Sequence, residues 1–132
     1  MIFSAIMLIS PFIAGFAAIL AVAAPPGYTG GGRHGATLTL TYTAEAGSAD
    51  AVELDCDPVG GGHPDGAAAC RTLDAADGDP GRIPPARTMC MMIYAPVDAE
   101  MTGRWHGRHV EWKHHYGNGC EMRRATGVIF QF

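Results

Sequence analysis

Four cysteines, Cys56, Cys70, Cys90 and Cys120, constrain the fold of this 132-residue chain more than any other feature. Their number is even, which in an exported protein indicates two disulfides, and four cysteines allow three pairings. The pairing that is local in sequence would close loops with separations of 14 and 30. Each such bridge would contribute roughly 3 to 4 kcal/mol by restricting the unfolded chain. Structural zinc needs close ligand pairs such as C-x-x-C, so the wide spacings favour disulfides over a metal.

The amino-terminal segment predicts export. Residues 1–24 form a continuous apolar run, and Ala21-Val22-Ala23 ends it with the small-x-small pattern of a signal peptide. We therefore expect residues 1–23 to be a cleaved signal peptide and the protein to be secreted. The run has no basic residue before it, because the first charged side chain is Arg33. A retained membrane anchor is the alternative, since about 20 apolar residues can span a bilayer.

The remaining residues have room for one domain. Residues 24–35 are rich in glycine and predict a flexible arm, and residues 36–132 carry the patterns of a folded domain. The formal net charge is -4 and the chain has a single lysine, Lys113. Such a chain has no positive field to attract nucleic acid or an anionic membrane, so neither is expected as a partner.

Hydrophobic periodicity predicts an α+β fold on an antiparallel sheet. Alternating apolar and polar residues indicate strands, and an alanine-rich stretch after a proline indicates one helix. Two more strands form a hairpin with Thr102-Gly103 as its turn, while Gly60 to Gly62 is expected to be a turn only. The predicted elements are strands at 36–43, 51–56, 92–101, 104–116 and 127–132, a helix at 64–76 and a long loop at 77–87.

No motif for catalysis or for a cofactor occurs in the chain. His106, His109, His114 and His115 fall within ten residues. On a strand, however, neighbours at odd spacing point to opposite faces, so we do not expect these histidines to hold one metal ion. A Cys–His nucleophile pair would need a free thiol, which the even cysteine count argues against. We expect a protein that is not an enzyme and has no metal or cofactor.

The segment TMCMMIYAPV, residues 88–97, is the most informative for function. One interpretation is the start of a buried strand in which the methionines fill the core. Met89, Met91 and Met92 cannot all face one side of a strand, so at least one should be exposed. The other interpretation is therefore a contact surface held beside a cysteine.

Short motifs spread from Ala36 to Phe132 resemble the Streptomyces subtilisin inhibitor family, which comprises small exported inhibitors of serine proteases. Their order and intervals together, with the cysteine spacing, carry the resemblance. They are Leu38-Thr39-Leu40-Thr41, Leu54-x-Cys56-x-Pro58, Gly62-His63-Pro64, Ala69-Cys70-x-x-Leu73, Gly78-Asp79, Met89-Cys90-x-Met92-x-Tyr94-x-Pro96-Val97, Gly103-x-Trp105-x-Gly107, Asn118-x-Cys120-Glu121-Met122 and Phe130-x-Phe132.

The resemblance implies a five-stranded antiparallel sheet with two helices, a homodimer, and the disulfides Cys56–Cys70 and Cys90–Cys120. It implies a reactive loop with the scissile bond Met92-Ile93, flanked by the contact residues Met89, Cys90, Met91, Tyr94 and Ala95. Met91 stands where the family often has proline. The implied partners are subtilisin-like serine proteases and, more weakly, chymotrypsin-like ones.

Two expectations concern the surroundings of this loop. Asn118, two residues before Cys120, is either a brace for the loop or an ordinary turn residue. The dimer should bury the sheet face opposite the helices, which we expect to include large apolar side chains. The alternative function is a secreted or membrane-anchored module on the same scaffold that inhibits no protease.

Overall fold

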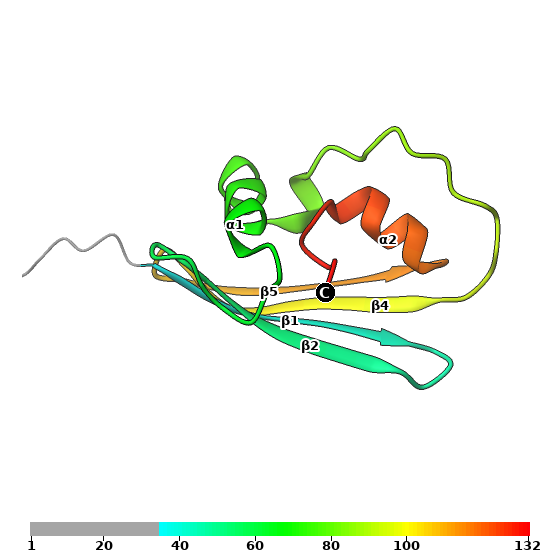
Figure 1. Cartoon of the computed structure of the whole chain (residues 1–132), viewed down its shortest axis with the longest axis horizontal. Helices are drawn as coiled ribbons and strands as arrows, with labels where there is room; N and C mark the ends of the chain where they lie inside the picture. Colours follow the sequence, from blue (N-terminus) through cyan, green and yellow to red (C-terminus); the bar gives the residue numbers. More distant parts are fainter. Residues whose placement is uncertain (1–34) are drawn as a thin grey trace, which may run out of the picture.

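The computed structural model describes residues 35–132, which form one antiparallel sheet covered on one face by two helices (Figure 1). The strand order is β3-β2-β1-β4-β5. The elements are β1 (Ala36–Ala44), β2 (Ala49–Cys56), β3 (Gly60–Gly61), α1 (Gly66–Ala75), the 3-10 turn η1 (Pro80–Arg82), β4 (Val97–Trp105), β5 (Arg108–Tyr116) and α2 (Gly119–Thr126). The signal-peptide and arm predictions fall on residues 1–34, outside the described part. Within that part, no helix combines the length and the apolar character needed to cross a membrane.

The sheet forms because β1 alternates apolar and polar residues, as the sequence predicted. Leu38 and Leu40 face the helices and are fully buried, while the threonines between them face outward. Strand β1 pairs with β2 on one side and with β4 on the other, so it lies at the centre of the sheet. Burying one face of such a strand fixes its register, because a slip by one residue would expose every leucine.

The core lies between the sheet and the helices. Its largest fully buried side chains include Trp105, Met101 and Phe130, and the disulfide Cys56–Cys70 joins the end of β2 to α1 inside it. Gly78, just after α1, has φ of +74°, and a Cβ there would lie 2.4 Å from Cγ of Trp105. Only glycine therefore allows the chain to cross the indole so closely.

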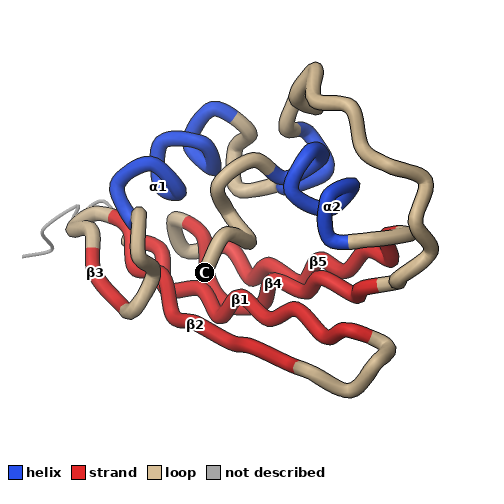
Figure 2. Tube along the Cα trace, turned by 45° about the vertical axis from the view of Figure 1, so that its right-hand side comes forward, coloured by secondary structure: helices blue, strands red, loops and turns tan. Residues whose placement is uncertain are grey.

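The carboxyl-terminal residues cross the helical layer instead of adding a strand to the sheet (Figure 2). Ile129 and Phe130 are buried side by side, which the alternation of a strand would not allow. The imidazole of His63 holds this segment: its Nε2 donates to the carbonyl of Ile129 at 3.0 Å, and its Nδ1 accepts from the Asp65 amide at 3.0 Å. The predicted strand at 127–132 was therefore wrong.

Two other predictions also change. The fifth strand is β3, at glycines predicted to be only a turn. The β4–β5 turn lies at His106-Gly107 rather than at Thr102-Gly103, because His106 and Gly107 both have positive φ, as a two-residue hairpin turn requires. Gly103 lies inside β4, and its missing side chain makes room for the backbone of Thr37 on β1.

The outer face of the sheet is polar, so the expected large apolar side chains do not lie there. It carries the four threonines of β1, Thr37, Thr39, Thr41 and Thr43, beside acidic and basic side chains of the neighbouring strands. Thr39, for example, lies opposite Glu53 and Thr102. The large hydrophobic side chains that are exposed lie elsewhere, almost all of them in one loop.

Candidate functional site

A long loop between η1 and β4 carries five exposed hydrophobic side chains. It sweeps around the outside of α2 before it enters β4 (Figures 1 and 2). The exposed fractions are 95% for Met89, 76% for Met91, 103% for Met92, 58% for Ile93 and 80% for Tyr94. Apolar side chains clustered on a surface in this way mark a site for contact with another molecule. Residues 92–96 are therefore not the start of a strand, and β4 begins only at Val97.

The disulfide Cys90–Cys120 attaches the loop to the first turn of α2. Its Cα atoms lie 5.8 Å apart, an ordinary separation for a disulfide. Both disulfides have the pairing that the family resemblance implied, and the described residues include no free cysteine. Cys90 lies two residues before Met92, so the covalent anchor acts close to the most exposed side chain of the loop.

Asn118 holds the loop by two hydrogen bonds that flank Met92. Its Nδ2 donates to the carbonyl of Ile93 at 2.8 Å and to the carbonyl of Met91 at 3.3 Å. The backbone is thus fixed immediately before and after Met92, while the Met92 side chain points into solvent. Among the backbone hydrogen bonds within residues 35–132, none uses the amide or the carbonyl of Met92. These two groups are free to pair with another chain.

The amide oxygen of the Asn118 side chain caps the start of a helix. Oδ1 accepts from the Glu121 amide at 2.9 Å, so Asn118 is the N-cap of α2. One amide side chain thereby uses its acceptor for the helix and its donors for the loop. The sequence analysis weighed a brace for the loop against an ordinary turn residue and did not consider a helix cap. The spacing of Asn118 and Glu121 is that of a capping box, which is a sequence signal for this helix start.

Backbone contacts anchor both ends of the loop, and the sequence analysis missed them. Upstream, the Ala86 amide donates to the carbonyl of Arg124 at 2.8 Å. Downstream, the Ala95 amide donates to the carbonyl of Gly117 at 2.9 Å, and the Glu45 amide donates to the carbonyl of Pro96 at 3.0 Å. Backbone groups are common to all residue types, so no side-chain pattern could have revealed these bonds.

The loop is also electrically neutral. From Thr88 to Val97 it contains no acidic or basic side chain, and the charged residues Arg87 and Asp98 flank it along the chain. In the adjoining helix the cation of Arg124 is paired with Glu121 at 2.8 Å. The site can therefore offer the free backbone groups of Met92 and a set of apolar side chains to a partner.

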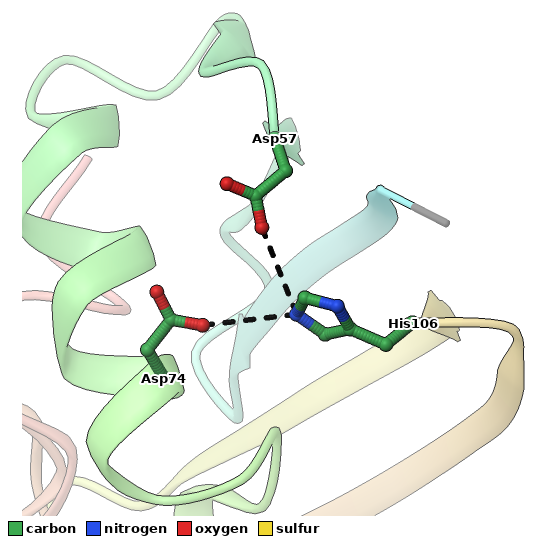
Figure 3. Close-up of side chains that lie close together, drawn as sticks. All are labelled: Asp57, Asp74 and His106. Carbon is green, nitrogen blue, oxygen red and sulfur yellow. Dashed lines mark ion pairs between the residues drawn. The ribbon is translucent and has the colours of Figure 1, made fainter. Parts of the chain in front are cut away.

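Two of the four histidines in residues 106–115, His114 and His115, lie opposite the start of β4, whereas His106 lies at its other end. His106 is in the turn after β4, at the opposite end of that strand from the loop, and its Nε2 lies 3.8 Å from Asp57 and 3.7 Å from Asp74 (Figure 3). These three side chains are exposed, and the ion pairs connect the turn to the end of β2 and to α1. His106 therefore lies in a turn. The expectation that it shares a strand with His109 was wrong.

The other three histidines of this stretch make separate contacts on β5. His115 pairs with Asp98 at 2.9 Å and His109 with Glu111 at 3.9 Å, both on the outer face. His114 points to the other face, where its ring lies 4.4 Å from that of Tyr116.

Comparison with known proteins finds relatives that are described as protease inhibitors. Residues 34–118 match the family model described as subtilisin inhibitor-like. A Streptomyces avermitilis protein described as a serine protease inhibitor is 56% identical over 77 residues, which are 58% of this chain and about half (52%) of that protein. Subtilisin inhibitor-like protein 1 of Streptomyces cacaoi is 35% identical over 98 residues, covering 71% of this chain and 89% of the relative.

A solved structure agrees with this match. Streptomyces caespitosus sermetstatin, crystallised in complex with Bacillus licheniformis subtilisin, superposes with a TM-score of 0.64 at 28% identity. The match covers 74% of this chain and 99% of sermetstatin. The fold, the two disulfides and the matched sequence all agree with the family that the sequence motifs resemble. The chain belongs to the subtilisin inhibitor-like family.

Proposed function

We propose that this protein inhibits subtilisin-like serine proteases by binding them as a substrate does, with Met92-Ile93 at the cleavage position. One observation carries the proposal: the Met92 side chain is fully exposed while Asn118 fixes the carbonyls on both sides of it. A side chain presented on a restrained backbone is what a protease pocket needs, because little freedom remains to be lost on binding. The family membership and the subtilisin complex of sermetstatin support the same partner class.

Binding follows the chemistry of a protease substrate cleft. The free amide and carbonyl of Met92 pair with the edge of the cleft, and the Met92 side chain fills the primary pocket. The Met92 carbonyl then points into the oxyanion hole, beside the nucleophilic serine. A thioether suits a large apolar pocket and offers no charge to the acidic base of a trypsin-type pocket. We therefore propose subtilisin-like proteases as the main targets and chymotrypsin-like ones as weaker targets.

The loop resists cleavage because its anchors hold both sides of the scissile bond. Cys90 is held on one side by its disulfide, and the Ala95 amide is held on the other by the carbonyl of Gly117. Asn118 bridges the two sides. If the protease cuts after Met92, the new amine of Ile93 therefore stays beside the acyl group. The bond re-forms more readily than the products separate.

Secretion and dimerisation belong to the same proposal. Removal of residues 1–23 would release the inhibitor outside the cell, and amino-terminal sequencing of the secreted material would show Ala24 first. A homodimer would use the outer face of the sheet. Because that face is polar, the contact would rest on paired threonines and charges rather than on apolar burial. Sedimentation at micromolar concentration distinguishes the dimer from a monomer.

Titration of subtilisin tests the inhibition directly. Active-site-titrated subtilisin is mixed with increasing amounts of the oxidised, disulfide-bonded protein, and residual activity on a small substrate is measured. We expect activity to fall linearly to an end point at one inhibitor chain per protease. Full activity at excess protein would contradict the proposal and favour the alternative of a non-inhibitory module on this scaffold.

A further inference from the structure

The methionines of the described domain fall into two groups with opposite surroundings. Met89, Met91 and Met92 lie in the loop and are 95%, 76% and 103% exposed. Met101 in β4 and Met122 in α2 are 0% and 2% exposed. Thioether groups are therefore exposed to solvent at the site of proposed protease contact and buried in the core.

Exposure decides which of these sulfur atoms can react with an oxidant. A peroxide transfers one oxygen atom to a thioether: the O–O bond breaks, an S=O bond forms, the sulfur is oxidised, and hydrogen peroxide leaves as water. The reaction needs direct approach to the sulfur, so buried methionines react slowly. The product, methionine sulfoxide, is polar where the thioether was apolar.

We propose that Met92 is an oxidation site that switches the inhibitor off, with a peroxide-class oxidant as the reagent. The inference rests on the proposed function, because its readout is protease inhibition. A sulfoxide oxygen carried into an apolar primary pocket loses its hydrogen bonds to water without gaining others, and this desolvation weakens the complex. Oxidation of Met89 and Met91 has a smaller effect, because their side chains do not enter that pocket.

The fold should survive the reaction. None of the three loop methionines belongs to the hydrophobic core. The bonds that hold the loop also leave their sulfur atoms unused: Asn118 donates to backbone carbonyls, and the covalent anchor is Cys90, already oxidised to a disulfide. Oxidation thus changes the chemistry of the contact surface while the scaffold keeps its shape. The reaction is reversible, because methionine sulfoxide reductases restore the thioether.

The test compares the same protein before and after peroxide treatment. The folded, disulfide-bonded protein is treated with dilute hydrogen peroxide, catalase removes the excess before subtilisin is added, and peptide mass mapping locates the added oxygen. We expect oxygen on the three loop methionines first, an unchanged circular dichroism spectrum, and about 100-fold weaker inhibition. Treatment with methionine sulfoxide reductases should restore inhibition.

Two variants locate the switch. Each variant is compared with itself, by dividing its inhibition constant after peroxide treatment by its constant before treatment. For Met92→Leu this ratio should stay near one. The double variant Met89→Leu, Met91→Leu keeps Met92, so its ratio should rise as in the parent protein. The inference is overturned if the parent with Met92 oxidised inhibits as well as before, if Met92→Leu loses inhibition equally, or if Met101 and Met122 oxidise as fast as the loop. Absence of inhibition by untreated protein would instead reject the proposed function, and the inference with it.

Discussion

The two disulfides are alike in chemistry but lie in opposite surroundings. Cys56–Cys70 joins a strand to a helix, and both of its cysteines are buried, 2% and 5% exposed. Cys90–Cys120 joins an irregular loop to a helix and is only half buried. The first bridge is surrounded by the core, whereas the second adjoins the most exposed side chains of the domain. The core bridge therefore contributes to stability alone, and the loop bridge contributes to stability and to the shape of a contact surface.

Removing the core bridge should produce the largest loss of stability. Replacing Cys56 and Cys70 by alanine releases a loop of 14 residues and empties part of a packed core, a cost of roughly 3 to 5 kcal/mol in the free energy of unfolding. Urea denaturation measures this loss. The molecules that remain folded should inhibit subtilisin as the parent does. Weak inhibition by a variant that is still fully folded would show that the core bridge also shapes the loop.

Removing the loop bridge should change function as well as stability. Serine at positions 90 and 120 releases 30 residues, which costs roughly 3 to 4 kcal/mol of unfolding free energy. The loop also loses its covalent anchor, so after cleavage the ends separate before the bond can re-form. We expect an inhibitor to become a substrate cut after Met92, which mass spectrometry of a digest detects. The core-bridge variant is the matched control. If the serine variant resists proteolysis as well as the parent, the bridge does not clamp the loop.

Changing the exposed side chain should affect binding without affecting the fold. Met92→Gly removes the group that fills the pocket and should weaken subtilisin binding by roughly 2 to 4 kcal/mol, as for other anchor residues. Met92→Lys should add inhibition of trypsin, because the ammonium reaches the acidic base of its pocket. Inhibition constants against both proteases measure these effects. An unchanged profile in a folded Met92→Lys protein would place the reactive bond elsewhere.

The core was easier to predict from sequence than the surface that contacts the partner. The alternation at Leu38 and Leu40 indicated a half-buried strand because burial imposes a period of two. The turn at His106 carried no comparable signal, since a positive φ is uncommon outside glycine. The last residues, Val128 to Phe132, have the composition of a strand but follow a helix, and the rings of Phe130 and Phe132 pack against aromatic side chains of the sheet. Composition does not show which neighbour covers a segment.

The loop was ambiguous for a related reason. A run of methionines is compatible with a core or with a contact surface, and the choice depends on anchors supplied by distant residues. Asn118 lies 25 and 27 residues from the carbonyls it binds. Its helix cap, by contrast, is local, and the interval from Asn118 to Glu121 could have shown it. Local contacts leave a pattern in the sequence, whereas this long-range brace does not.

Replacing one atom of the Asn118 side chain separates its role as the cap of α2 from its role as the brace of the loop. In Asn118→Asp the carboxylate keeps an oxygen for the Glu121 amide, so the cap of α2 survives. The second oxygen replaces Nδ2 and faces the carbonyls of Met91 and Ile93, so both loop hydrogen bonds are lost. In Asn118→Ala the cap and the brace are lost together.

We therefore expect the two variants to differ in stability but to be alike in their faster cleavage. Both losses of stability should be smaller than those caused by removing a disulfide. Asn118→Ala should lower the free energy of unfolding by about 1 to 2 kcal/mol, whereas Asn118→Asp should lower it by less because the helix keeps its cap. Both variants should be cut after Met92 faster than the parent, since the brace holds the carbonyl of Ile93 and shares that of Met91 with the Ile93 amide. Urea denaturation and the rate of cleavage during incubation with subtilisin give the two numbers. If Asn118→Asp stays as resistant to cleavage as the parent, the disulfide and the backbone anchors hold the loop without help from the amide.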